Sequence, residues 1–152
     1  PDSDWVLSGI NDGANLGVDI YMSGTVAAVR EAALLGKPAV AFSQYRRSNQ
    51  PIDWQISTGL AVAVLRRLCA QPLPAGSYWN VNFPAQPHGS EIPDLVVCRP
   101  DHNALPVEFE QRGGEFHFRA DYHARRRERD TDVEICFSGG ISVSRVDVGG
   151  DR

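Results

Sequence analysis

Cysteine is scarce in this sequence: only three occur in 152 residues, at Cys69, Cys98 and Cys136. The number is odd and no two of them lie close together, so neither a disulfide framework nor a zinc site of the paired-cysteine kind is predicted. Free thiols are typical of proteins in a reducing compartment. We therefore expect a cytoplasmic protein.

Long apolar runs and an excess of basic residues are also missing. No apolar stretch approaches the roughly 20 residues that a membrane-spanning helix needs, and no signal-peptide pattern opens the chain. The 15 Lys and Arg residues are outnumbered by 19 Asp and Glu residues, which gives a net charge of −4, whereas nucleic-acid-binding domains are usually basic. We therefore expect neither a membrane nor a nucleic-acid polymer as partner.

The two familiar nucleotide-binding motifs are absent as well. Gly9, Gly13 and Gly17 fit neither G-x-G-x-x-G nor G-x-x-x-x-G-K-[ST], which excludes a dinucleotide fingerprint and a Walker-type phosphate loop. The four histidines show no H-E-x-x-H or other ligand spacing. His117, which stands between two phenylalanines, is expected on a solvated hairpin.

What the sequence does contain is an alternation of strand and helix patterns. Trp5–Ser8 is a short apolar strand pattern, and the apolar spacing within Val26–Leu35 predicts a largely buried helix. Gly36 and then Pro38 stop this helix, in the order expected of a helix end. Ala39–Phe42 is a second apolar run, so the first forty residues predict a βαβ unit with parallel strands.

The pattern continues along the rest of the chain. The further predicted elements are a helix over Ile52–Ala70, strands over Trp79–Pro84, Leu95–Cys98 and Ile141–Ser144, and a glycine-turn hairpin within residues 105–123. These elements predict a single α/β domain over residues 1–152, from which the hairpin projects. Because Pro1 is not an initiator methionine and a buried strand follows almost at once, we also expect that other strands precede it and that the chain is a fragment or a truncated product.

The segment Ser8–Thr25 is the predicted functional centre, because ligands of open α/β sheets bind beyond the carboxyl ends of the strands. Asn11 and Asn15 offer both an acceptor for a metal ion and donors for an anion. The helix start near residues 23–25 offers unpaired N–H groups and a positive dipole end to a phosphate. A plainer interpretation is also open, since Ser before a helix is commonly an N-cap and Asn-Asp-Gly is commonly a turn.

Two later segments carry charged side chains that allow two interpretations each. Asp130–Asp132 either supplies a carboxylate to a site or caps a final helical turn. The arginine-rich segment 125–129 is expected to be a mobile solvated loop, with attraction of a phosphate as the alternative.

Several segments resemble the SurE family of survival-protein nucleotide phosphatases. The similar segments are Ser8–Gly17, Tyr21–Val26, Arg30–Ala39, Asn80–Pro84, Thr131–Val133 and Ile141–Ser144, and the hairpin is the least similar part. The resemblance implies an α/β fold with a Rossmann-like, three-layer parallel sheet. It also implies hydrolysis of nucleoside monophosphates (5'/3'-nucleotidase activity) with one divalent metal cation, Mg²⁺ or Mn²⁺, per subunit of a homodimer or homotetramer.

The resemblance assigns roles to particular residues. Asn11 corresponds to the asparagine of the family's metal site, and the residues that correspond to its phosphate pocket are Asn15, Ser23, Gly24 and Thr25. The family's adjacent aspartates and its metal-site serine have no counterpart here, so the catalytic residues are unknown and the aspartates are expected upstream of Pro1. The family's C-terminal helix is also absent.

One neutral asparagine cannot hold a hard divalent cation. The chain is therefore expected to be inactive by itself and to belong to a phosphatase only when the missing segment is supplied. The alternative is a non-catalytic phosphate- or nucleotide-binding remnant or regulatory module.

Overall fold

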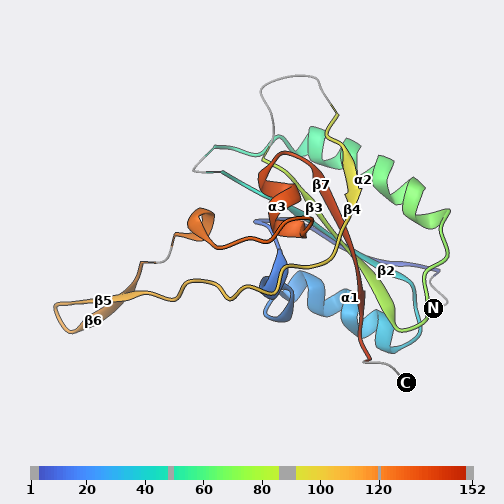
Figure 1. Cartoon of the computed structure of the whole chain (residues 1–152). Coiled ribbons are helices and arrows are strands. Elements are labelled where there is room, and N and C mark those ends of the chain that lie inside the picture. Colours follow the sequence, from blue (N-terminus) through green and yellow to red (C-terminus); the bar gives the residue numbers. More distant parts are fainter. Residues whose placement is uncertain (1–3, 48–49, 86–91, 120, 150–152) are drawn as a thin grey trace.

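The computed structural model describes residues 4–47, 50–85, 92–119 and 121–149. Its centre is a five-stranded sheet in the order β1-β2-β3-β7-β4 (Figure 1). The strands are β1 (Val6–Asp12), β2 (Ala39–Gln44), β3 (Ser77–Phe83), β4 (Leu95–Val97) and β7 (Ile141–Asp147). The strands predicted from the sequence are thus all present.

The sheet is mostly parallel but not entirely so, which corrects the expectation of a parallel sheet. β1, β2 and β3 run parallel, β4 runs parallel to β7, and β7 runs antiparallel to β3. The reason lies in helix α3 (Asp132–Phe137), which packs at the carboxyl edge of β1–β3 through Val133 and Cys136. Only residues 138–140 link α3 to β7, and a crossover to the far edge of the sheet needs a dozen residues or more.

Two helices cover opposite faces of the sheet and make the three layers that the resemblance implies. Helix α1 (Gly24–Leu34) packs its small residues against Ala39 and Ala41 of β2. Helix α2 (Trp54–Cys69) packs Val64 and Leu68 against the other face, on a cluster that also holds Phe42 and Phe83. Because side chains of β2 alternate between the faces, this one strand contributes to both clusters.

The hairpin is present where the sequence predicts it. β5 (Phe109–Arg112) and β6 (Glu115–Phe118) form a separate antiparallel sheet that projects from the main body, and the chain returns through the short helix η2 (Tyr122–Ala124) (Figure 1). All side chains of β6 are exposed, including His117. None of the helices in the described part of the chain is long and apolar enough to cross a membrane.

Strand β1 is longer than predicted and continues to the candidate site through an irregularity. Its register with β2 shifts between Ser8 and Asn11, and Gly9 lies there with φ +117°. A Cβ atom at Gly9 would lie 2.2 Å from the carbonyl oxygen of Phe42. Only glycine fits so close to the neighbouring backbone, and this close approach sets where Asn11 emerges from the strand.

We predict that Gly9→Ala lowers the free energy of unfolding by at least about 2 kcal/mol, because the new methyl group meets backbone at a φ that side chains rarely adopt. Urea unfolding followed by tryptophan fluorescence measures the change. Gly59→Ala in α2 is the matched control, because its Cβ meets nothing within 4 Å and alanine favours a helix. Equal stability of the two variants would contradict the proposed contact.

Candidate functional site

Asn11 lies near the end of β1, where the chain turns into the loop of residues 13–16. Its Nδ2 donates to the carbonyl oxygen of Gly13 at 2.7 Å, and the amide of Gly13 donates to the carbonyl of Gln44 at 3.0 Å. Asn11 and Asp12 are thus still strand residues, so the turn expected at Asn-Asp-Gly is not formed there, and the chain bends only at Gly13. The bond uses the side-chain nitrogen of Asn11, so the side-chain oxygen, the atom that could bind a cation, is not part of it.

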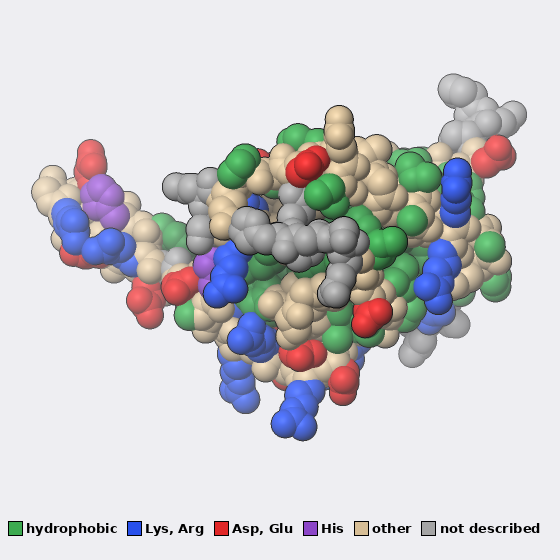
Figure 2. Space-filling model, turned by 90° about the horizontal axis from the view of Figure 1, so that it is seen from above, with side chains coloured by type: hydrophobic (Ala, Val, Ile, Leu, Met, Phe, Trp, Pro, Cys, Tyr) green, Lys and Arg blue, Asp and Glu red, His purple; other side chains and the backbone are tan. Residues whose placement is uncertain are grey.

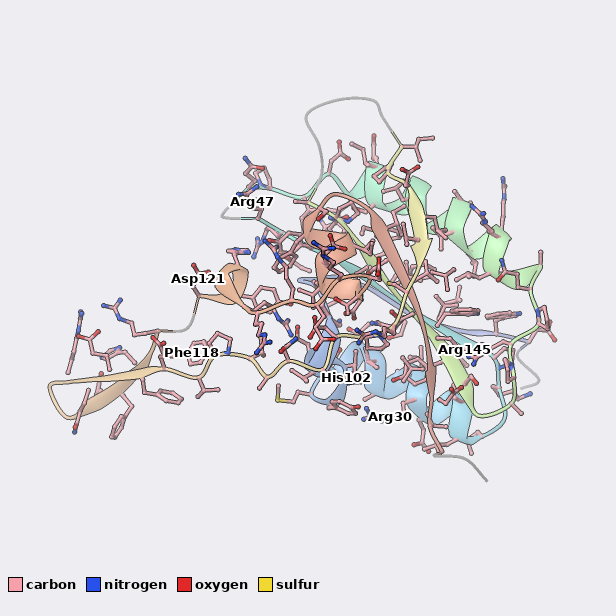
Figure 3. All side chains as sticks on the ribbon, viewed as in Figure 1. Arg30, Arg47, His102, Phe118, Asp121 and Arg145 are labelled. Carbon is pink, nitrogen blue, oxygen red and sulfur yellow. The ribbon has the colours of Figure 1, made fainter. Side chains whose placement is uncertain are left out.

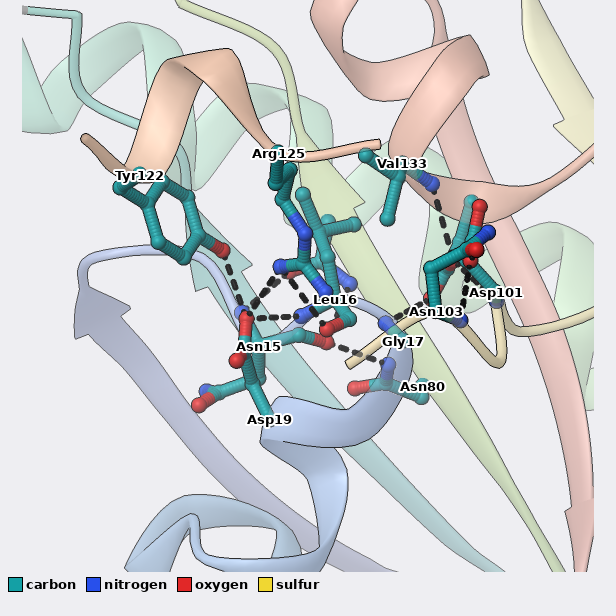
Figure 4. A network of polar contacts seen from close by, with 12 residues as sticks. Asn15, Leu16, Gly17, Asp19, Asn80, Asp101, Asn103, Tyr122, Arg125 and Val133 are labelled. Carbon is teal, nitrogen blue, oxygen red and sulfur yellow. Dashed lines mark hydrogen bonds and ion pairs between the residues drawn. The ribbon is translucent and has the colours of Figure 1, made fainter. Parts of the chain in front are cut away.

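Asn15 is buried and held by side chains of two strands. Its Nδ2 donates to Ser43 Oγ at 2.7 Å, and its backbone N–H donates to Asn82 Oδ1 at 2.8 Å. Its carbonyl oxygen accepts from the Nδ2 atoms of Asn80, at 2.9 Å, and Asn82, at 3.1 Å (Figure 4). The Asn82 carboxamide thus pairs with the backbone of Asn15 as a neighbouring strand would, and fixes the loop to β3.

The same loop is fixed from its other side by the buried carboxylate of Asp132. This carboxylate accepts hydrogen bonds from the backbone N–H groups of Gly17, Asp101 and Val133, each at 2.8 Å. Gly17 has φ +55°, and a Cβ atom there would lie 2.8 Å from the carbonyl oxygen of Asp101. Asp132 is therefore neither a free site carboxylate nor a simple cap, because it joins helix α3 to the segments that contain Gly17 and Asp101.

Arg125 is a correction to the expected solvated arginine loop, because its side chain is completely buried. Its Nη1 atom lies 3.0 Å from Asp19 Oδ2, which also accepts the hydroxyl of Tyr122 at 2.6 Å (Figure 4). Asp19 belongs to the short helix η1 (Gly17–Tyr21), which the sequence patterns did not predict. The chain returning from the hairpin is thus anchored on the loop that follows β1. Arg126 and Arg127 are exposed, as expected.

The predicted phosphate seat lies at the start of α1. Ser23 is the N-cap, and its Oγ accepts the N–H of Val26 at 3.1 Å, so the plainer interpretation of this serine is confirmed. The first N–H groups of a helix have no partner within it, and a Cβ atom at Gly24 would meet nothing within 4 Å. The backbone at Gly24 and Thr25 is therefore open to a ligand at the positive end of the helix dipole.

Burial changes the protonation of the carboxylate that holds the loop. It raises the pKa of Asp132 to about 6, and the hydrogen bonds from Gly17, Asp101 and Val133 oppose this rise. For Asp101, the hydrogen bonds from Glu128, Asn103 and Thr131 outweigh burial and lower its pKa. The two neighbouring aspartates therefore titrate in different pH ranges.

The described residues do not form a metal site by themselves. No group of three His, Cys, Asp or Glu residues in the described ranges is arranged to hold a metal ion; His88 lies outside these ranges. Asn11 would offer one neutral oxygen, and its neighbour Asp12 lies 3.5 Å from Arg46 in a partly exposed ion pair. A hard divalent cation needs more anionic oxygen ligands than these.

The residues that hold the loop were not predicted from the sequence. Asn80 and Asn82 alternate with apolar residues in a completely buried strand, and two asparagines on one face of such a strand are a signal that could have identified them. The sequence around Asp132 predicts only a site carboxylate or a cap. No local pattern indicates that Arg125 is buried among exposed arginines.

The fold, and the loop and helix start at the carboxyl edge of β1–β3, define an open α/β protein. Proteins of this class bind small ligands beyond the carboxyl ends of their strands. The family described as Survival protein SurE matches residues 1–105. The chain therefore belongs to the SurE family.

The comparisons with individual proteins agree with this family. A Synechocystis sp. protein named as a candidate 5'-nucleotidase is 43% identical over 148 residues, which are 97% of this chain and 66% of the relative. The 5'-nucleotidase SurE 1 of Thermus thermophilus is 38% identical over 94% of this chain and 57% of its own length. The crystal structure of the Aquifex aeolicus SurE protein superposes with a TM-score of 0.83 at 30% identity, over 100% of this chain and 62% of that one. This chain thus spans about two thirds of the length of the relatives it matches, or less.

We predict that Asn82→Ala destabilises the protein by about 2–3 kcal/mol, because it leaves the buried N–H of Asn15 without its acceptor and removes one donor to its carbonyl oxygen. Urea unfolding of the variant measures the loss. Asn103→Ala, which removes a partly exposed side-chain bond to Asp101, serves as the control and is expected to cost clearly less. A smaller loss at Asn82 than at Asn103 would contradict the role of Asn82.

We also predict a pH dependence of stability from Asp132. Its pKa is about 6 in the folded protein and near 3.8 when unfolded, so the folded state binds the extra proton between these values. The free energy of unfolding contributed by this group therefore falls as the pH rises from about 4 to 6, by up to about 3 kcal/mol.

The measurement is the stability of the parent protein minus that of Asp132→Asn at each pH from 4 to 7. The difference should decrease with rising pH and become constant above pH 7. Asp101→Asn, at the neighbouring aspartate whose pKa is lowered, is the control, and its difference should not decrease over this range. A difference that increases from pH 4 to 6 would show that the pKa of Asp132 is lowered.

Proposed function

We propose that the complete protein is a phosphomonoester hydrolase acting on nucleoside monophosphates, and that this chain supplies its phosphate-holding part. The observation that carries the proposal is the fixed loop between β1 and α1, in a chain that belongs to a family whose similar members are named 5'-nucleotidase. This loop joins two candidate groups, Asn11 and the open start of α1. Both lie at the carboxyl edge, where α/β proteins bind their ligands.

Each predicted residue has a part in this proposal. The backbone N–H groups at Gly24 and Thr25 bind the phosphate oxygens and stabilise the negative charge that grows on them during hydrolysis. Ser23 fixes the first turn of the helix as its N-cap. Asn15 shapes the pocket by holding the loop, since Ser43 already occupies its amide nitrogen. Asn11 directs its side-chain oxygen or amide toward the reacting group.

A divalent cation, Mg²⁺ or Mn²⁺, one per subunit, belongs to the proposal for the complete protein only. The described residues do not fit such an ion on their own, so its anionic ligands and the catalytic aspartates would come from the part of the relatives that this chain does not span. The 152-residue chain alone is accordingly proposed to be inactive. A cytoplasmic location and a homodimer or homotetramer complete the proposal.

The second candidate is a non-catalytic phosphate- or nucleotide-binding module. The observation that favours it is the lack of a carboxylate cluster among the described residues. The two candidates differ in a simple measurement on the complete protein. Release of inorganic phosphate from nucleoside monophosphates with Mg²⁺ or Mn²⁺, abolished by EDTA, supports the enzyme. Stabilisation by phosphate without turnover supports the binding module.

We predict that Asn11→Ala in the complete protein lowers kcat at least about 100-fold and raises the metal concentration needed for half-maximal activity, because the side-chain oxygen proposed to bind the metal ion is lost. A colorimetric phosphate assay over a range of Mg²⁺ and Mn²⁺ concentrations measures both effects. Gln55→Ala, at the exposed start of α2, is the control and should leave both values unchanged. Unaltered metal-dependent turnover in Asn11→Ala would refute the assignment.

A further inference from the structure

A hollow of about 450 Å³ lies beside the candidate site at the same edge of the sheet. Small-molecule sites usually have volumes of a few hundred Å³ or more. The residues of its lining that matter here are Tyr45, Arg47, His123, Arg127, Phe137 and Ser138. They come from the end of β2, from the segment returning from the hairpin and from α3. We name this site the Arg47–Arg127 hollow.

The floor of the hollow is a set of packed aromatic rings. Tyr45 and Phe137 stack with their ring centroids 4.7 Å apart, and the Tyr45 hydroxyl lies 2.6 Å from Nδ1 of His123. Burial raises the pKa of Tyr45, so its hydroxyl stays protonated at neutral pH and can donate to Nδ1. In that arrangement the neutral His123 ring carries its proton on Nε2, and is a further hydrogen-bond donor in the lining.

The charged groups of the hollow are all cationic. Arg47 and Arg127 line it, and no Asp or Glu is among the described lining residues. The Arg127 guanidinium lies over the Phe137 ring, with 5.6 Å to its centroid, which holds it at the rim. In the described part of the chain neither arginine forms an ion pair, whereas Arg46, Arg99 and Arg125 do.

This concentration of positive charge is unusual for a chain with a net charge of −4. Basic side chains gather beside a histidine at the base of the projecting hairpin (Figure 2). Arg47 lies on the side of the sheet from which the hairpin projects (Figure 3). A concave site that is lined by one sign of charge attracts small ligands of the opposite sign.

The hollow is also next to the loop that follows β1. Ala14 of this loop packs against the cluster that contains Tyr45, with Phe137 packed beside it. We propose that the Arg47–Arg127 hollow is a second oxyanion site, which binds a phosphate-type group of a phosphorylated small molecule. Guanidinium groups bind such oxyanions through paired, charge-assisted hydrogen bonds, and His123 adds a neutral donor.

The test uses the imidazole signals of His123 in NMR spectra of the complete protein, assigned with His123→Asn, while inorganic phosphate is added at constant pH and ionic strength. This readout reports on the hollow whether or not phosphate also binds at α1, and it requires no turnover. We expect a saturable shift of the His123 signals. The double variant Arg47→Gln and Arg127→Gln should raise the phosphate concentration at the midpoint of this shift at least about tenfold.

Arg126→Gln is the matched control, because this neighbouring arginine is exposed and does not line the hollow. It removes the same charge and should leave the midpoint unchanged. The proposal is overturned if phosphate does not shift the His123 signals, or if the double variant and Arg126→Gln have equal midpoints.

Two ligands distinguish the sources of the oxyanion. A nucleoside 3',5'-bisphosphate that titrates His123 at a lower concentration than inorganic phosphate would show that the hollow binds a second phosphate of a larger ligand. Equal midpoints would show that it binds the free ion. Asn11→Ala should retain the shift in either case, so a failure of the proposed catalytic function is distinguishable from a failure of this site.

Discussion

The structure depends on how the polar backbone of the loop after β1 is satisfied in the interior. Buried N–H and C=O groups without partners are costly, and this loop is too irregular to pair with a strand. Asn82 supplies a donor and an acceptor to Asn15 from one side, and Asp132 accepts the N–H of Gly17 from the other. Side chains thus take the place of a sheet neighbour and give the loop one conformation.

This arrangement connects parts of the chain that are distant in sequence. Asn15 and Asn82 are 67 residues apart, and Gly17 and Asp132 are 115 apart. The excursion that carries the hairpin leaves the body at Asp101, whose carbonyl oxygen lies close to Gly17, and returns at Arg125, which pairs with Asp19. The same packing brings Arg127 and His123 to the end of β2, where they meet Arg47 and form the cationic hollow.

Much of the fold was predictable from the sequence because local signals agree with it. The helix stop at Gly36, the apolar run Ala39–Phe42 and the glycine turn of the hairpin each indicate one structure. The antiparallel direction of β7 was not predictable, because it follows from where α3 packs. The extension of β1 to Asp12 is not predicted because Gly9 and Asn11 interrupt the apolar pattern. The close approach of Gly9 to the backbone of Phe42 is a contact between distant residues, which no local sequence pattern indicates.

The candidate site was predictable in position but not in construction. The end of the first strand, the glycines that follow it and the start of the next helix together identify the segment Ser8–Thr25. The residues that fix it are long-range partners, and hydrogen bonds across more than 60 residues have no sequence periodicity. The balance of burial and hydrogen bonds also sets their chemistry, because burial raises the pKa of Asp132 whereas hydrogen bonds outweigh burial and lower the pKa of Asp101.

The central claim is that side chains from β3 and α3 hold this loop in a single conformation. Hydrogen exchange of the backbone amides of Asn15 and Gly17 in the complete protein tests it most directly. The account predicts that both amides exchange as slowly as those of the buried strand β3, because each is bonded to a buried side chain. Exchange at the rate of exposed loop amides would contradict it.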